Sequence, residues 1–463
     1  MPRLPWLAEG LPGLRILCRD LMTGEANIDA LFESAKRAHQ DGRLDAALEG
    51  YNRVLARVPA HVGAIYHKAL LAFQAGRHEE CLALLGEALA LAPDDVELNF
   101  RKGFVLLAGG RPEEALAPLE RAAELLPLWF EPYLKLGAAN VALGRREQAQ
   151  DWFQRALLAD PGLQRAPFDE RRPPAQREEI LAALNMVGER QWAIASDALD
   201  AAARAHPGAD LARIERGFRI LCGREERVFN HPLRQPKFLY LPDLPATPWF
   251  EPGDFDWVPE VEAALPEVRA ELEQLIREEA EFVPYVAEGT VSASGTDFSS
   301  LAGSMEWNAF HLNQGGWVED RCRRCPATTE AMSKVPPARM RGFAPEILFS
   351  RLQAGGHIVP HYGLMNVRLT VHMGVIVPED CGIRVAEETR GWQEGRVLLF
   401  DDSFEHEAWN RSARDRSVLI FEVWHPAVEP AEIVAIEHLF EARQAWLDRC
   451  KPPEAAPAAP AAH

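Results

Sequence analysis

Two histidines in the C-terminal half of the chain are the residues best suited to chemistry. His361 ends the strand-like stretch Ile-Val-Pro-His, and His406 follows the acidic turn Asp-Asp-Ser-Phe-Glu further along. In a jelly-roll barrel, strands that are distant in sequence become neighbours and point alternate side chains inward. Two inward imidazoles suit a transition metal such as iron. The pair therefore predicts a metal centre inside a β-barrel.

A glycine stands where a third protein ligand is usual. In many non-haem Fe(II) oxygenases a carboxylate lies two residues after the first histidine, so that both side chains project from one face of a strand. That position is Gly363 here. As an alternative, Asp401, Asp402 or Glu405 could supply the missing carboxylate, although a turn of acids is more typical of a solvated loop or an anchor for a ligand histidine.

The region around the histidines resembles the aspartyl/asparaginyl β-hydroxylase family. The matching motifs are His-Tyr-Gly from His361, Arg-Leu-Thr-Val-His at 368–372 and Phe-Glu-His-Glu at 404–407. The resemblance extends over 236–430. In that family iron is held by two histidines, with glycine in the carboxylate's place. The resemblance implies that His361 and His406 bind Fe(II) in a double-stranded β-helix, a jelly-roll or cupin-like domain.

The same resemblance implies a site for 2-oxoglutarate, with dioxygen as the other cosubstrate. The positions that hold or adjoin 2-oxoglutarate in the family are occupied here by Trp307, Ser350, Arg368, His372 and Arg416. Some members carry a second arginine where this chain has Thr370. The family's reaction is hydroxylation of an unactivated carbon, as in a peptide-aspartate β-dioxygenase. Chloride in the vacant carboxylate position would allow halogenation instead, but the resemblance favours hydroxylation.

Residue alternation supports an inward-facing polar cluster without reference to the family. From 367 to 373 the odd positions are apolar and the even ones are Arg368, Thr370 and His372, which is the pattern of a strand with two unlike faces. A buried arginine needs an anion, and a dicarboxylic acid can chelate a metal through one carboxylate while the other contacts a guanidinium. Arg416, just before an apolar strand, fits this second role.

The N-terminal half carries a 34-residue period. Four glycines and four prolines repeat at this step: Gly42, Gly76, Gly110, Gly144, Pro59, Pro93, Pro127 and Pro161. Small residues follow each glycine by five positions and large residues by nine, which marks one helix face. The period is that of tetratricopeptide repeats, paired helices that stack into a solenoid. We predict four repeats, at 28–61, 62–95, 96–129 and 130–163.

These motifs predict a multidomain chain with an α-helical solenoid followed by a β-barrel. The boundaries that we expect are an N-terminal segment 1–27, repeats 28–163, a helical cap and connector 164–235, a hydroxylase-like domain 236–450 and a disordered Ala/Pro tail 451–463. A solenoid must cover the apolar face of its last repeat, which explains the expected cap.

Composition limits the partners and the compartment. The formal net charge of −19 argues against binding to nucleic acid or to an anionic membrane surface. No apolar run is long enough to span a bilayer, and charged residues among 1–22 argue against a signal peptide. Seven scattered cysteines are typical of a reducing cytosol, and Cys322 and Cys325 are expected to be a loop cystine or two ordinary thiols rather than zinc ligands. We therefore expect a cytoplasmic protein.

Taken together, the sequence predicts an Fe(II)/2-oxoglutarate-dependent hydroxylase whose repeats recruit a protein or peptide and present an aspartyl or asparaginyl side chain. One alternative keeps the chemistry but acts on a small molecule, such as a free amino acid or an acyl chain. Another is a non-catalytic repeat scaffold whose barrel is a relic, although a relic would have little reason to keep the residues of both sites together.

Overall fold

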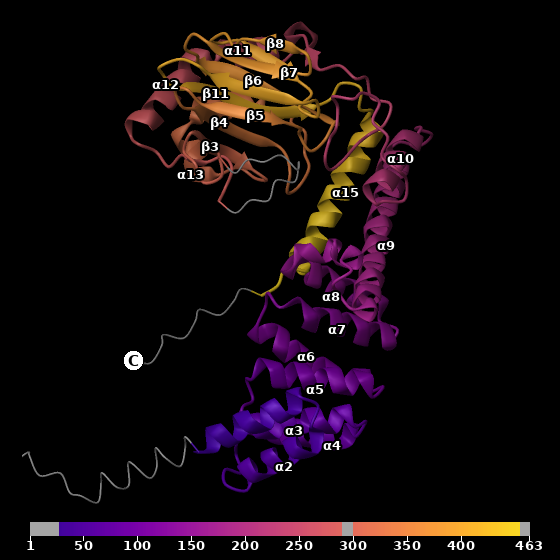
Figure 1. The fold of residues 1–463 in the computed structure, drawn as a ribbon. Coiled ribbons are helices and arrows are strands. Elements are labelled where there is room, and N and C mark those ends of the chain that lie inside the picture. The colour runs from indigo at the N-terminus through magenta and orange to yellow at the C-terminus, as the bar shows by residue number, and fades with distance from the viewer. Residues whose placement is uncertain (1–26, 289–299, 454–463) are drawn as a thin grey trace, which may run out of the picture. The chain divides into compact units, whose positions relative to one another are not determined.

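The protein forms two compact units in the computed structural model, which describes residues 27–288 and 300–453 (Figure 1). The first unit runs to Val187 and includes the described residues from Arg449 onward, and the second is Gly188–Asp448. The predicted segment 1–27 lies outside the described residues except for its last residue. The same holds for 454–463 of the predicted tail.

The first unit is the predicted tetratricopeptide solenoid. After a helix at 27–40 it contains α2 (Leu44–Leu55), α3 (Val62–Gln74), α4 (His78–Leu91), α5 (Val96–Ala108), α6 (Pro112–Leu125), α7 (Phe130–Ala142) and α8 (Arg146–Ala159). The glycines of the 34-residue period all have φ between +72° and +74°, where a side chain would be strained, and each links the two helices of a repeat.

Close packing explains the small residues of the period. Ala47, Cys81, Ala115 and Ala149 are completely buried. In the fourth repeat a Cβ on Gly137 would lie 2.2 Å from the ring of Phe153, so only glycine lets α7 and α8 approach this closely. The repeat array and the fold class are thus confirmed.

Beyond the repeats, helices continue as η1 (Pro161–Gln164), η2 (Ala166–Phe168), α9 (Pro174–Ala205) and α10 (Ala212–Leu221). Two stretches of helical apolar pattern, at 178–187 and 192–205, lie in the expected cap and connector. A single helix, α9, covers both because no proline interrupts it, and Gly188 weakens it by only about 1 kcal/mol.

The second unit contains two antiparallel sheets. The larger has the order β1 (Trp249–Phe250), β9 (Val397–Phe400), β6 (Arg368–Ile376), β11 (Arg416–Trp424), β4 (Glu346–Leu352), β3 (Trp307–Gln314) and β2 (Val283–Pro284). The smaller has the order β5 (His357–His361), β10 (His406–Asn410), β7 (Cys381–Val385) and β8 (Glu388–Arg390). This arrangement is consistent with a jelly roll.

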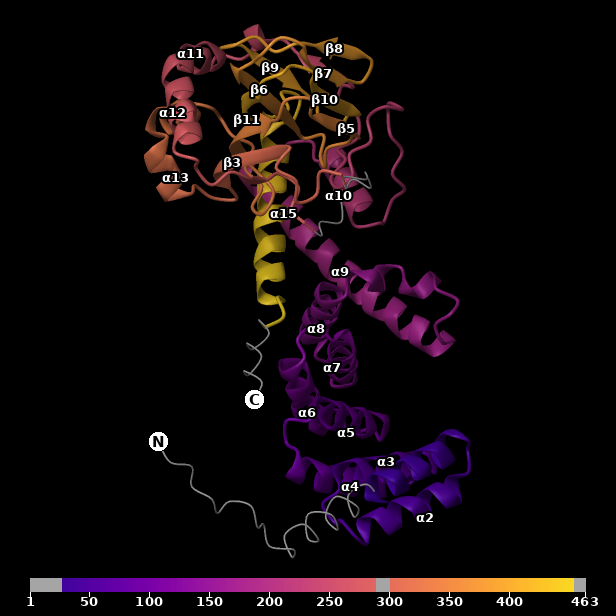
Figure 2. The ribbon, with the colours of Figure 1, turned by 60° about the vertical axis from the view of Figure 1, so that its left-hand side comes forward.

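Helices cover the outside of the larger sheet (Figure 2). They are α11 (Val258–Ala263), α12 (Leu265–Arg277), α13 (Glu319–Arg324) and α14 (Pro326–Ser333), while η3 (Pro252–Asp254) follows β1 and α15 (Pro430–Arg449) follows β11. The odd residues of β6, Leu369, Val371 and Met373, pack in the same apolar cluster as α11 and α12. The even residues of β6 therefore face the space between the sheets. No helix in the described ranges is long and apolar enough to cross a bilayer.

Candidate active site

His361 and His406 face one another across neighbouring strands. They are direct partners in the antiparallel pairing of β5 with β10, and their ring centroids are 4.0 Å apart. The Nδ1 atom of His361 lies 2.7 Å from the Val359 carbonyl oxygen, and that of His406 lies 2.9 Å from the carbonyl of Phe404. Because a carbonyl only accepts, each Nδ1 carries the proton and each Nε2 keeps a lone pair for a metal.

Burial keeps both imidazoles neutral. It lowers the pKa of His361 to about 3 and that of His406 to about 4, with each pKa starting from an ordinary value of 6.5. A neutral imidazole is the form that binds a metal ion, whereas a protonated ring repels it. The two side chains are thus in the ligand state over the whole physiological range of pH.

The lowered pKa values predict iron binding that depends little on acidity. Protons compete with the metal only as the pH approaches the folded-state pKa, so the Fe(II) dissociation constant should change less than about twofold between about pH 7.5 and about pH 5.5. Imidazoles with the ordinary pKa would each weaken binding roughly tenfold at the lower pH. Anaerobic titration of Fe(II) at both pH values measures this, and a hundredfold loss would contradict it.

All seven residues predicted for the two sites line one cavity of about 560 Å³ between the sheets: Trp307, Ser350, His361, Arg368, His372, His406 and Arg416. We call it the central cavity. Apolar residues of both sheets, among them Ile358, Ile383 and Ile420, form other parts of its wall. The strands of the barrel thus bring together residues from one end of the domain sequence to the other.

Arg416 lies at the closed end of this cavity, and no carboxylate of the described residues forms an ion pair with it. Its residue exposure is 1%, and Nε and Nη1 are buried and have no hydrogen-bond partner in the described part of the chain. The guanidinium lies 4.7 Å from the Trp392 ring centroid. Burial lowers the pKa of Arg416 to about 10, so the group stays charged. A buried charge of this kind is costly unless an anion pairs with it.

Neighbouring polar groups extend this anion site. Ser350 accepts a hydrogen bond of 3.1 Å from Nε1 of Trp307, which leaves its own hydroxyl proton to donate. His372 is 8% exposed, and its Nδ1 has no partner among the described residues. These donors together with Arg416 fit a carboxylate, and the nearby histidine pair fits a metal that the rest of a dicarboxylic acid could chelate.

Arg368 stands apart from these groups. Arg368 pairs with Trp424 at one end of β11, whereas Arg416 lies at the other end of that strand. The guanidinium of Arg368 contacts the carboxylate of Glu422. A second carboxylate, Asp402, lies 3.7 Å away. Arg368 thus already has protein anions as partners, unlike the isolated arginine that the strand pattern suggested.

Gly363 leaves room for the carboxylate of Asp402. A Cβ on Gly363 would lie 2.3 Å from Cγ of Asp402, so this carboxylate occupies the space of the absent side chain. The other acids of the turn have different partners, since Asp401 pairs with Arg234 and Glu405 with Arg384. Within the described residues, no three His, Cys, Asp or Glu side chains converge in the geometry of a metal site.

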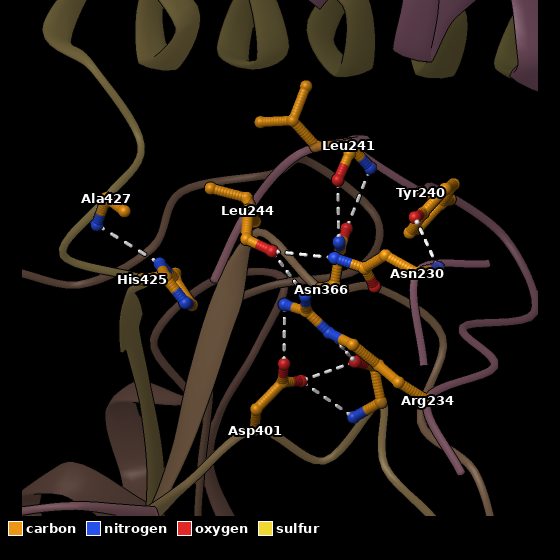
Figure 3. Close-up of polar contacts among 10 residues, drawn as sticks. Asn230, Arg234, Tyr240, Leu241, Leu244, Asn366, Asp401, His425 and Ala427 are labelled. Carbon is orange, nitrogen blue, oxygen red and sulfur yellow. Dashed lines mark hydrogen bonds and ion pairs between the residues drawn. The ribbon is translucent and has the colours of Figure 1, made fainter. Parts of the chain in front are cut away.

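A buried ion pair fixes the turn that leads into His406 (Figure 3). Arg234 and Asp401 are both completely buried and 2.7 Å apart. Asp401 also accepts hydrogen bonds from the backbone and hydroxyl of Ser403, while Arg234 donates to the Leu244 carbonyl. Burial raises the pKa of Asp401 to about 6, although Arg234 opposes this. The contacts hold the loop before β10 and so orient the histidine that begins it.

Comparison with known proteins decides the family. The profile of the aspartyl/asparaginyl β-hydroxylase family matches residues 262–426, and tetratricopeptide-repeat profiles match 38–99 and 130–162. The aspartate β-hydroxylase domain-containing protein 2 of Mus musculus is 31% identical over 244 residues, which are 51% of this chain and 68% of that protein. The chain belongs to the aspartyl/asparaginyl β-hydroxylase family.

Two other relatives carry names that refer to different substrates. Aspartyl/asparaginyl β-hydroxylase of Homo sapiens is 37% identical over 196 residues, which cover 41% of this chain but only 24% of the human protein. Ornithine lipid ester-linked acyl 2-hydroxylase of Rhizobium tropici is 34% identical over 191 residues, 40% of this chain and 64% of that enzyme. The matches therefore span a quarter to two thirds of these relatives.

Glu422 is a cavity residue that the sequence analysis missed, although its spacing from Arg416 in the sequence could have revealed it. Glu422 stands an even number of positions after Arg416 on β11, so the two must share the inward face. Glu346, at the start of β4, donates its backbone N–H to the Glu422 carboxylate and also lines the cavity. Tyr285 and His311 also line the cavity, and no local spacing in the sequence predicts their place there.

The close approach at Gly363 predicts different effects for two glycine variants of this protein. Gly363→Ala should lower the free energy of unfolding by about 1–3 kcal/mol and weaken iron binding, because the Asp402 carboxylate must move. Gly253→Ala is the control, since nothing lies within 4 Å of a Cβ there. Thermal unfolding and Fe(II) titration measure both effects. If the two variants had the same free energy of unfolding and the same Fe(II) affinity, the space beside Asp402 would be large enough for a side chain at position 363.

Proposed function

We propose that this protein is an Fe(II)- and 2-oxoglutarate-dependent dioxygenase that hydroxylates an unactivated carbon. The observation that carries the proposal is the presence, in one cavity, of two neutral, inward histidines and a buried guanidinium with no carboxylate partner among the described residues. When bound, Fe(II) and 2-oxoglutarate together supply the means to activate dioxygen for hydroxylation. Membership of a hydroxylase family supports the same reaction class.

Each residue of the central cavity has a defined task in this proposal. His361 and His406 hold the metal through Nε2, because backbone carbonyls engage their Nδ1 protons. Arg416 binds one carboxylate of 2-oxoglutarate, with donors from Ser350 and His372 beside it. Apolar walls exclude water, which strengthens these electrostatic contacts.

For the substrate, we propose an aspartyl or asparaginyl residue of a protein or peptide that the tetratricopeptide repeats recruit. The name of the human relative supports this side-chain class. Helix pairs that stack into a solenoid commonly offer an extended binding surface. The six cysteines that the structure describes are unbridged, which supports action in a reducing compartment such as the cytoplasm.

A second candidate substrate is an acyl chain or another small molecule. The relative from Rhizobium tropici is named for hydroxylation of an ester-linked acyl group, and its match to this chain is similar in extent to that of the human protein. In this case the chemistry at the iron is unchanged and the repeats bind a separate partner.

Succinate release tests the proposal and separates its two forms. Purified protein is supplied with Fe(II), 2-oxoglutarate and dioxygen, together with a library of peptides that contain aspartate or asparagine, with free amino acids, or with acyl esters. Stimulation by peptides supports the first form, and stimulation by acyl esters or free amino acids supports the second. Failure of all of them, with no uncoupled turnover either, would contradict the reaction class.

A further inference from the structure

The central cavity has ends of opposite charge. Along β11, Arg416 and Glu422 both point inward, and a strand rises about 3.3 Å per residue, so their Cα atoms are separated by about 20 Å. The Arg416 end is closed, with Arg416 and Ser350 each 1% exposed. At the other end the side chain of Glu346 is 29% exposed. The cavity is therefore open to solvent beside Glu346.

Carboxylates outnumber cations at this open end. Glu346, Asp402 and Glu422 line it, and Arg368 is the one arginine or lysine there among the described cavity residues. Glu422 contacts Arg368 and accepts a hydrogen bond from the Glu346 backbone at 3.0 Å. Asp402 is 8% exposed, and its Oδ1 has no hydrogen-bond partner in the described ranges. The Thr370 hydroxyl is a donor to the Asp402 carboxylate, and Oδ1 can accept one more hydrogen bond.

The other groups that face Glu346 do not supply a charge. Tyr285 donates its hydroxyl to Glu346 at 3.2 Å. His311 lies 4.0 Å from the same carboxylate, but burial lowers the pKa of His311 to about 4, so the ring is neutral. Burial also raises the pKa of both Glu346 and Asp402, although the charge of Arg368 opposes this rise.

Binding of the proposed Fe(II) and 2-oxoglutarate does not change the excess of negative charge in the cavity. The lining residues comprise two arginines and three carboxylates, which is an excess of one negative charge. Fe(II) and the doubly charged 2-oxoglutarate cancel one another. An aspartyl side chain would then add a second uncompensated charge, while an ammonium or guanidinium would neutralise the first. Inside a water-poor cavity this difference favours the cation strongly.

We propose that the open end of the central cavity, formed by Glu346, Asp402 and Glu422, binds a cationic group of the substrate, an ammonium or guanidinium. The inference rests on the proposed function and narrows it. A lysine or arginine of the substrate beside the residue presented to the iron meets this requirement. An isolated aspartyl side chain does not, because Arg368 is already engaged and Thr370 carries no charge.

Binding of three small probes tests this. The anaerobic full-length protein, loaded with Fe(II) and 2-oxoglutarate, is titrated with the N-acetyl methylamides of lysine, norleucine and aspartate, and the perturbation of the visible metal-to-ligand band is followed. We expect the lysine probe to bind at least about tenfold more tightly than the other two, the size of one charged hydrogen bond. Equal or tighter binding of the aspartate probe, or no binding of any probe, overturns the inference.

A charge-neutral variant assigns the effect to the carboxylate. Glu346→Gln keeps the size of the side chain and an acceptor for Tyr285, and should weaken the lysine probe roughly tenfold without changing the norleucine probe. Glu330→Gln, on the exposed face of α14, is the control and should leave both unchanged. An unaffected lysine probe in Glu346→Gln overturns the inference. Absence of the band before any probe is added is a separate outcome, because it contradicts the proposed function itself.

Discussion

Replacement of either histidine by alanine is expected to lower turnover by at least about a hundredfold, since even the loss of groups that merely support metal ligands costs ten- to a hundredfold. Only two protein ligands are proposed, and each supplies one Nε2 from a buried, neutral ring. His361→Ala or His406→Ala therefore removes half of the protein's hold on iron. The loss is measured as succinate formation at saturating Fe(II) and 2-oxoglutarate. If no substrate is present, the succinate formed in the uncoupled reaction is measured instead.

The matched control for this pair is His357→Ala. His357 lies on β5 like His361, but it is exposed and pairs with Glu407 at 2.9 Å. Its removal should leave turnover within about twofold of the wild-type value, since exposed ion pairs contribute little. If His361→Ala and His406→Ala both behaved like His357→Ala, the histidine pair would not be the metal centre.

Loss of the guanidinium at the closed end should act on 2-oxoglutarate rather than on iron. We expect Arg416→Ala to raise the KM for 2-oxoglutarate by about a hundredfold, which corresponds to roughly 3 kcal/mol for a buried, charge-assisted contact. Iron affinity in the absence of 2-oxoglutarate should change little, because Arg416 is not a ligand. Arg416→Lys should recover part of the loss, since lysine keeps the charge without the two-pronged geometry.

Arg411→Ala provides the comparison. Arg411 is an exposed arginine that lies over the Trp409 ring, with 4.8 Å between guanidinium carbon and ring centroid. Its removal should not alter the KM for 2-oxoglutarate. An unchanged KM in Arg416→Ala, with the protein still folded by circular dichroism, would mean that the cosubstrate's carboxylate binds elsewhere.

Much of the architecture was predictable because it is periodic. The 34-residue recurrence of glycine and proline specifies the helix pairs directly, and positive φ at Gly42 and its equivalents is the physical reason for the recurrence. The two-residue alternation of 367–373 likewise predicted which side of β6 is polar. In both cases a local pattern determines the element and the face it buries.

The partners inside the cavity were less predictable because they depend on strand register. Arg368 meets Glu422 only through the pairing of β6 with β11, and no local spacing reveals that contact. The fit of the Asp402 carboxylate beside Gly363 depends similarly on the turn before β10. Identical residue types could have left Arg368 free of protein carboxylates, and its predicted place beside 2-oxoglutarate stays a prediction.

The central claim is tested most directly by anaerobic titration of the purified protein with Fe(II) and 2-oxoglutarate, with wild type and His406→Ala compared. Chelation of iron by 2-oxoglutarate produces a weak visible metal-to-ligand absorption band. We predict the band in the wild type and its absence in the variant. No band in either protein would contradict the oxygenase account and would leave the tetratricopeptide repeats as the functional part of the chain.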